Sequence, residues 1–150
     1  MTLTELIAMT RLLSRDINGY IFTDQIVTLY INQCIDRLKQ YKVFGNMVHL
    51  ATGTDVPILL PETYHYMIAL FAASRCLDMD ERFYEGTEKR NEFEALFDEL
   101  IAEIQSGNLV IYDATDTAVE DTTTYIDAIT DVYYAEDEYA DIDEGVDGVE

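Results

Sequence analysis

The spacing of apolar residues between Met1 and Ser106 constrains the fold of this chain more than any other feature. In four stretches these residues recur every three or four positions, so they would share one face of an α-helix. The clearest stretch follows Thr23, and its apolar positions are Ile26, Val27, Tyr30, Ile31, Cys34, Ile35, Leu38 and Tyr41. We therefore predict a mainly α fold, a small bundle of about four helices around one core.

Capping signals predict the ends of the first two helices. Thr2 and Glu5 have the spacing of a capping box before a helix whose apolar face holds Leu3, Leu6, Ile7 and Leu13. Asn18-Gly19 predicts the turn that ends this segment. Thr23, followed by Asp24 in the first turn, is a good N-cap for the second helix.

Two further helices are predicted in residues 61–107. Pro61 suits the first turn of a third helix from about Glu62 to Met79, which is apolar nearly all round and should be central. A fourth helix is supported by Glu85 and Lys89 at i,i+4 spacing and ends at Gly107. Its apolar residues are Phe83, Tyr84, Phe93, Leu96, Phe97, Leu100, Ile101 and Ile104.

Between Lys42 and Leu60 the helical spacing disappears. Residues 47–50 and 56–60 have the pattern of two short extended segments around a turn at residues 52–55. Pro57 limits the second segment to an edge strand. We expect a short β-like insertion between the second and third helices.

Charge divides the chain into two parts. Residues 1–90 hold nine basic and eleven acidic residues, a net charge of −2, whereas residues 91–150 hold nineteen acidic residues and no basic one. From residue 108 onward Tyr, Val and Ile alternate with acids, and Lys, Arg, Pro and Ser are all missing. We predict a helical domain at 1–107 and an extended acidic, Tyr-rich C-terminal arm at 108–150.

The arm has too little apolar surface for a core of its own, so we expect it to be ordered by packing on another surface. The residues expected to make that contact are its larger apolar and aromatic side chains: Leu109, Val110, Ile111, Tyr112, Tyr125, Ile126, Ile129, Val132, Tyr133, Tyr134 and Tyr139.

The composition argues against several classes of partner. With nine Lys and Arg residues in a chain of net charge −21, binding to nucleic-acid phosphates or to anionic membranes is disfavoured. No segment approaches 18 apolar residues and no signal peptide is recognisable, so we expect a cytoplasmic site of synthesis. Cys34 and Cys76 lie within helical patterns and are expected to be buried, reduced thiols.

Catalytic and metal-binding motifs are missing from the sequence. The three serines lie outside any G-x-S-x-G motif, and no phosphate-binding glycine loop or H-E-x-x-H motif occurs. His49 and His65 are expected at the surface or in the core rather than in a catalytic site. The segment Asp141–Glu150 partly resembles a calcium loop, but it has Gly145 and Val146 at positions five and six. We expect no enzyme, no cofactor and no dedicated metal site, and weak screening of the arm by divalent cations stays open.

Residues 1–106 resemble the head-to-tail connector adaptors of tailed bacteriophages. The segments that carry the resemblance are Thr23-Asp24-Gln25-Ile26, Leu59-Leu60-Pro61-Glu62-x-Tyr64, Ala72-Ala73-Ser74-Arg75-Cys76-Leu77 and Phe93-x-x-Leu96-Phe97. The resemblance implies a structural virion protein without enzymatic activity, assembled in the host cytoplasm and located in the neck of the virion. In that family many copies, typically twelve, form a homo-oligomeric ring beneath the portal protein.

Such a ring extends the DNA channel and offers a platform for the next neck or tail protein. A channel that DNA passes through without specific binding agrees with an acidic chain, because like charge repels phosphates. We expect the arm to dock on the portal or on a neighbouring subunit, in part by adding a strand.

Two alternatives stay open. An acidic protein of this size is also typical of DNA mimics that inhibit a DNA-binding enzyme, although the charge here is concentrated at one end rather than spread over the folded domain. A different neck component, such as a stopper or tail-completion protein, differs from an adaptor only in its position.

Overall fold

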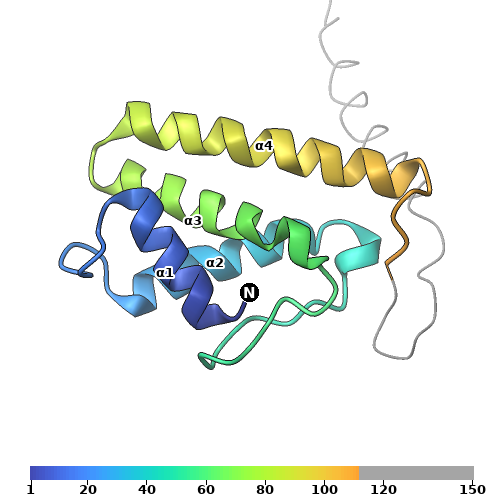
Figure 1. Cartoon of the computed structure of the whole chain (residues 1–150), viewed down its shortest axis with the longest axis horizontal. Helices are drawn as coiled ribbons and strands as arrows, with labels where there is room; N and C mark the ends of the chain where they lie inside the picture. Colours follow the sequence, from blue (N-terminus) through green and yellow to red (C-terminus); the bar gives the residue numbers. More distant parts are fainter. Residues whose placement is uncertain (112–150) are drawn as a thin grey trace, which may run out of the picture.

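The structure, a computed structural model, describes residues 1–111, which form four α-helices (Figure 1). These are α1 (Leu3–Ser14), α2 (Asp24–Leu38), α3 (His65–Met79) and α4 (Phe83–Gln105), with single 3₁₀ turns η1 (Lys42–Phe44) and η2 (Glu62–Tyr64). The described residues contain no strand. The prediction of a mainly helical fold of about four helices is confirmed.

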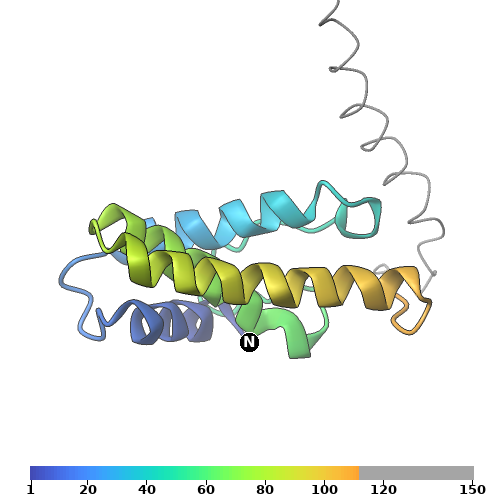
Figure 2. The ribbon, with the colours of Figure 1, turned by 90° about the horizontal axis from the view of Figure 1, so that it is seen from above.

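Helix α3 is the centre of the bundle. It packs against each of the other three helices, and α1 also contacts α2. In the view from above, α1 and α2 lie to either side of α4 (Figure 2). Eleven of the fifteen α3 residues are buried, which confirms the prediction that this helix is covered on most sides.

The predicted helix ends are confirmed at three places. Thr2 and Glu5 form the complete capping box of α1, and the Thr23 hydroxyl accepts the N–H of Ile26 at the start of α2. Gly107 follows the last turn of α4 with a φ of 74°, and its N–H donates to the carbonyl of Ile104. A left-handed φ of this kind favours glycine after a helix.

The predicted β-like insertion between α2 and α3 is wrong. The turn at residues 52–55 is present, but the segments on either side form no ladder. Other groups satisfy their backbone instead: the Asn32 side chain bonds both the N–H and the carbonyl of Leu50, at 2.9 and 3.0 Å. At the tip, the backbone N–H groups of Leu3 and Thr4 donate to the carbonyls of Asp55 and Gly53. The insertion is therefore attached to α1 and α2 rather than paired with itself.

The predicted pair of Glu85 with Lys89 is also wrong. Lys89 contacts Glu92 at 2.8 Å, and Glu85 contacts Arg82 one turn earlier. Arg82 is held beside Glu85 because its guanidinium also donates to the carbonyl of Ser14, at 3.0 Å. The contact between Ser14 of α1 and Arg82 therefore explains why Glu85 pairs with Arg82 rather than with Lys89.

A polar clamp joins α2 to α4 at the edge of the core. The Arg37 guanidinium donates to both carboxylate oxygens of Glu94, at 2.8 and 2.7 Å, and lies over the rings of Phe93 and Phe97. Cys34 and Cys76 are buried and free, as predicted, and burial raises the pKa of the Cys76 thiol to about 12. No helix within residues 1–111 is long and apolar enough to cross a membrane.

Candidate interaction surface

One end of the bundle gathers exposed apolar side chains. Twelve large apolar residues are exposed in residues 1–111. Three of them lie on the connection from α1 to α2, and three lie at the last residue of α3 and the first two residues of α4, on either side of the second connection. Both connections lie at the left-hand end of the molecule in Figure 1. We call this surface the apolar end, and its residues are Ile17, Tyr20, Ile21, Met79, Phe83 and Tyr84, which are 51–87% exposed.

Direct contacts hold the two connections together. Arg82 donates to the carbonyl of Ser14, and Arg15 lies 3.6 Å from Glu85. The Tyr30 hydroxyl of α2 contacts the sulfur of Met79 at 3.5 Å. The two connections therefore lie side by side at this end of the bundle.

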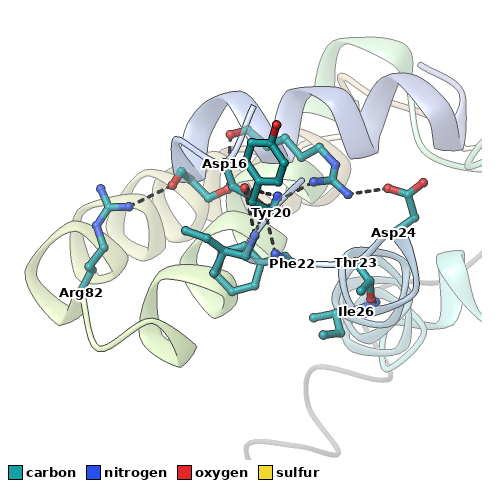
Figure 3. A network of polar contacts seen from close by, with 10 residues as sticks. Asp16, Tyr20, Phe22, Thr23, Asp24, Ile26 and Arg82 are labelled. Atoms are coloured by element: carbon teal, nitrogen blue, oxygen red, sulfur yellow. Dashed lines mark hydrogen bonds and ion pairs between the residues drawn. The ribbon is translucent and has the colours of Figure 1, made fainter. Parts of the chain in front are cut away.

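Asp16 holds the connection between α1 and α2. Its carboxylate accepts the backbone N–H groups of three consecutive residues, Tyr20 and Phe22 at 2.9 Å and Ile21 at 3.2 Å, as Figure 3 shows. Asp16 is only 4% exposed. Buried bonds of this kind do not compete with water, so they fix the path of the backbone.

Arg11 adds a second restraint to the same connection. Its guanidinium bridges Asp16, at 3.4 Å, and the exposed Asp24 at 2.6 Å. Burial raises the pKa of the Asp16 carboxyl, but the three N–H donors and Arg11 outweigh that effect and hold the pKa below its ordinary value. Asp16 is therefore ionised at neutral pH, with its charge compensated inside the fold.

The same bonds determine which side chains point outward. Phe22 is 2% exposed and anchors the connection in the core, while its neighbours Tyr20 and Ile21 are 87% and 51% exposed. Gly19 has a φ of 68°, and a Cβ at this position would overlap the Arg11 guanidinium. Glycine is therefore required here for backbone conformation and for space.

Two residues of these connections have a strained backbone. Arg15 and Glu81, each with a φ of 60°, are the only non-glycine residues of positive φ in the described part of the chain. Glu81 closes α3, and the next N–H, of Arg82, donates to the carbonyl of Leu77 at 2.9 Å. The Arg15 side chain has a partner in Glu85, whereas Glu81 is exposed and forms no ion pair within residues 1–111.

Two shallow hollows lie away from the apolar end. One, of about 330 Å³, lies on the insertion between Val48, Val56 and Ile58; the other, of about 450 Å³, lies along α1 beside Met9 and Leu12. The first hollow is also lined by His49, Thr54 and Asp55, and the second by Glu5 and Glu62. Within the described residues, no three His, Cys, Asp or Glu side chains gather in a way that could hold a metal ion.

Both histidines contact polar groups of the fold. His49 is at the surface, 2.7 Å from Asp36. His65 is 6% exposed, with Nε2 2.8 Å from the carbonyl of Leu60 and Nδ1 2.6 Å from the nitrogen of Met1. Burial lowers the pKa of His65. One histidine is thus at the surface and the other in the core.

The structure describes only the start of the predicted arm. Ile111 is 6% exposed within the core, Leu109 packs partly against it, and Val110 is 48% exposed. Residues 109–111 thus continue along the helical core, with Val110 exposed, Leu109 half-buried and Ile111 buried. The domain boundary at 107 and the role of these residues in partner binding stay predictions. The other predicted contact residues lie outside the described residues: Tyr112, Tyr125, Ile126, Ile129, Val132, Tyr133, Tyr134 and Tyr139. So does the segment 141–150.

Sequence reasoning missed the apolar end. One signal was available, because Ile17, Tyr20 and Ile21 surround the Asn18-Gly19 turn, where polar residues are expected. Phe83 and Tyr84 were assigned to the fourth helix, and nothing in their spacing separates an outward from an inward direction at a helix start. Comparison with known proteins adds no relative: no family model, no curated protein and no solved structure matches the chain.

Proposed function

We propose that this protein is a head-to-tail adaptor of a tailed bacteriophage. Many copies would form a ring beneath the portal protein, extend the DNA channel and receive the next neck or tail protein. The observation that carries the proposal is the apolar end, where six exposed apolar side chains lie on or beside two braced connections. Exposed patches of this kind mark protein-binding sites.

The side chains of the apolar end are of the types that dominate binding. Tyr and Phe contribute large areas at a small cost in conformational entropy, and Met adapts to irregular surfaces. The buried bonds of Asp16 and the contact between Arg82 and Ser14 fix the backbone below them. A protein that joins two other proteins needs a preformed surface of this kind.

The charge distribution supports the same function. A chain of net charge −21 repels DNA phosphates, which suits a channel that DNA passes through without binding. Residues 1–111 carry nine basic and sixteen acidic residues, a net charge of −7, and residues 112–150 carry the other fourteen acids. The helical domain therefore repels its neighbours less strongly than the arm does. The acidic residues after Arg90 would lie toward the lumen, toward solvent or against basic partner surfaces.

The arm would supply a second contact, to the portal protein or to a neighbouring subunit. Because Leu109 and Ile111 pack against the helical core, truncation after Ile111 removes the arm without opening the domain. We expect the truncated chain to fold and to bind portal rings more weakly than the full chain. Equal binding of the two would show that the arm is not the anchor.

The adaptor function is tested by mass and by imaging. Sedimentation and negative-stain microscopy of the purified chain, alone and mixed with portal rings of the same phage, should reveal a ring or a monomer that assembles on the portal. A chain that ignores the portal under all these conditions contradicts the proposal. The position of its gene, next to a portal or capsid gene, is an independent check.

The net charge favours one other function, that of a DNA mimic. A mimic would inhibit a restriction enzyme, nuclease or repressor as a monomer or dimer. Inhibition that disappears when residues 112–150 are removed, together with no binding to portal rings, would favour the mimic over the adaptor. A stopper or tail-completion protein would instead bind a neighbouring neck protein but not the portal.

A further inference from the structure

We propose that Asn18 is a site of spontaneous deamidation, and that the hydrogen bonds of the connection between α1 and α2 slow this reaction in the folded chain. The inference is independent of the adaptor function, because it rests on the chemistry of one turn. It assigns a covalent modification to the turn between Ile17 and Tyr20, two residues of the apolar end.

The turn at Asn18 combines the groups that deamidation requires. Asn18 is exposed, and the residue that follows it is Gly19. No other asparagine in the sequence precedes a glycine. Because glycine has no side chain, its backbone nitrogen can approach the preceding amide carbon without steric hindrance. Asparagine is also one of the thermally labile residue types.

The reaction proceeds through a cyclic imide. The Gly19 nitrogen attacks the Cγ atom of Asn18, so that a C–N bond forms and the bond from Cγ to the side-chain nitrogen breaks. That nitrogen leaves as ammonia together with the proton of the Gly19 nitrogen. Water then opens the imide: attack at Cγ gives aspartate, and attack at the backbone carbonyl carbon gives isoaspartate. Either product has a carboxylate in place of the neutral amide.

The folded structure restrains the attacking nitrogen. The Gly19 N–H donates to the carbonyl of Asp16 at 2.9 Å, and this hydrogen bond must break before the nitrogen loses its proton and attacks. The N–H of Asp16 donates in turn to the carbonyl of Arg11, also at 2.9 Å. The N-terminal side of the turn is therefore attached to the end of α1.

The Asp16 carboxylate restrains the other side of the turn. From its buried position it accepts the N–H groups of residues 20–22, and such bonds do not compete with water. Asn18 thus contacts water, but its backbone lies between two fixed points. The reaction requires local opening of the connection, so its rate should follow the population of the open form.

Conversion of Asn18 should loosen the same connection. In isoaspartate the chain runs through Cγ, so the backbone gains a methylene group between residues 18 and 19. The N–H groups of residues 20–22 then shift relative to the Asp16 carboxylate, and their hydrogen bonds to it lengthen or break. The modified chain would hold Tyr20 and Ile21 less firmly than the original chain does.

The test follows the full chain over time in a mildly alkaline buffer by peptide mass spectrometry, in which fragment spectra assign each conversion to its residue. In guanidinium chloride, which unfolds the chain, Asn18 should convert faster than any other asparagine. Without denaturant its conversion should be at least about tenfold slower. Asn18→Gln is the control for the site, because the longer side chain closes its ring far more slowly.

Two substitutions separate protection by the turn from stability in general. Asp16→Asn weakens the bonds to residues 20–22 and should speed the conversion of Asn18 at least about tenfold. Asn32→Ala removes the bonds between α2 and the insertion and should leave the rate close to that of the unaltered chain. In the isoaspartyl product, amide exchange at residues 20–22 should be faster than in the unmodified chain.

Three results would overturn the inference. If another asparagine converts faster than Asn18 in the unfolded chain, Asn18 is not the preferred site. If Asn18 converts equally fast with and without denaturant, the fold does not slow the reaction. Equal rates in Asp16→Asn and Asn32→Ala would show that the bonds of Asp16 are not what protects the turn.

Discussion

The two long connections of this fold are each held by an aspartate carboxylate, but the two carboxylates differ in burial. In residues 15–23 and in the insertion at 45–61, an aspartate carboxylate accepts the N–H groups of consecutive residues. Asp16 does so from a buried position, at 4% exposure, whereas Asp55 does so on the surface. Because water replaces surface hydrogen bonds at little cost, only the Asp16 bonds should contribute much to stability.

The insertion depends on a different residue for its attachment to the core. Asn32 of α2 bonds both backbone groups of Leu50, which is 2% exposed. An aspartate that accepts consecutive backbone N–H groups can therefore fix the geometry of a turn alone, or it can also stabilise the whole fold. We expect the second effect only where the aspartate is buried. Four substitutions test this, in order of decreasing expected effect.

The largest effect is expected from Asp16→Asn. The amide keeps one acceptor but places an NH₂ group against backbone donors, and we expect a loss of about 3 kcal/mol in the free energy of unfolding by urea titration. Asp24→Asn removes the other, exposed partner of Arg11, and it should cost less than about 1 kcal/mol. Equal losses in the two variants would contradict the role of burial.

Asp16→Asn also tests how the stability of the fold depends on pH. The folded pKa of Asp16 is lowered, so its stabilising contribution is complete above the unfolded value of about 3.9. That contribution is lost as the pH falls through the folded pKa. The stability difference between the unaltered chain and Asp16→Asn should therefore shrink below about pH 4. A difference that stays constant from pH 7 to pH 3 would contradict the assignment.

A smaller effect is expected from Gly19→Ala. The methyl group strains a residue with a left-handed backbone and displaces the Arg11 guanidinium. We expect the free energy of unfolding to fall by about 2 kcal/mol. Gly107→Ala is the matched control, because Gly107 has a similar φ of 74° but open space around its Cβ position. It should cost about 1 kcal/mol. The difference between the two losses in free energy measures the cost of displacing the Arg11 guanidinium.

Asn32→Ala tests the attachment of the insertion. Loss of the two partly buried bonds to Leu50 should lower the free energy of unfolding by about 1.5 kcal/mol and increase amide exchange across the insertion. Gln33→Ala, at the exposed neighbouring position, should change neither. Identical exchange in the two variants would mean that Leu50 is held by its apolar contacts alone.

The smallest effect is expected from Asp55→Asn. Hydrogen bonds from Thr52 and Ala51 lower the pKa of Asp55, yet the carboxylate is at the surface and water can replace those partners. The urea midpoint should stay close to that of the unaltered chain, while chemical shifts of residues 51–55 change. A loss of stability comparable to that of Asp16→Asn would contradict the conclusion that burial makes the Asp16 hydrogen bonds the more stabilising ones.

Much of the fold could be predicted because it depends on local chemistry. The capping box of Thr2 and Glu5, the N-cap at Thr23 and the apolar stripe of α2 lie within a few residues of the structure they determine. The insertion was mispredicted because Asn32 and the first turn of α1, both distant in sequence, satisfy its backbone. Glu85 was assigned the wrong partner because Arg82 is positioned by Ser14, sixty-eight residues away.

The helices, the central place of α3 and the division of charge could be read from the chain alone, because periodicity, capping and composition are properties of neighbouring residues. Which apolar residues stay exposed depends on how the elements pack together. Tyr20 and Phe22 are two positions apart and equally aromatic, yet one is 87% and the other 2% exposed. The buried Asp16 and the packing of α1 against α3 decide that difference, because exposure depends on which elements meet in space.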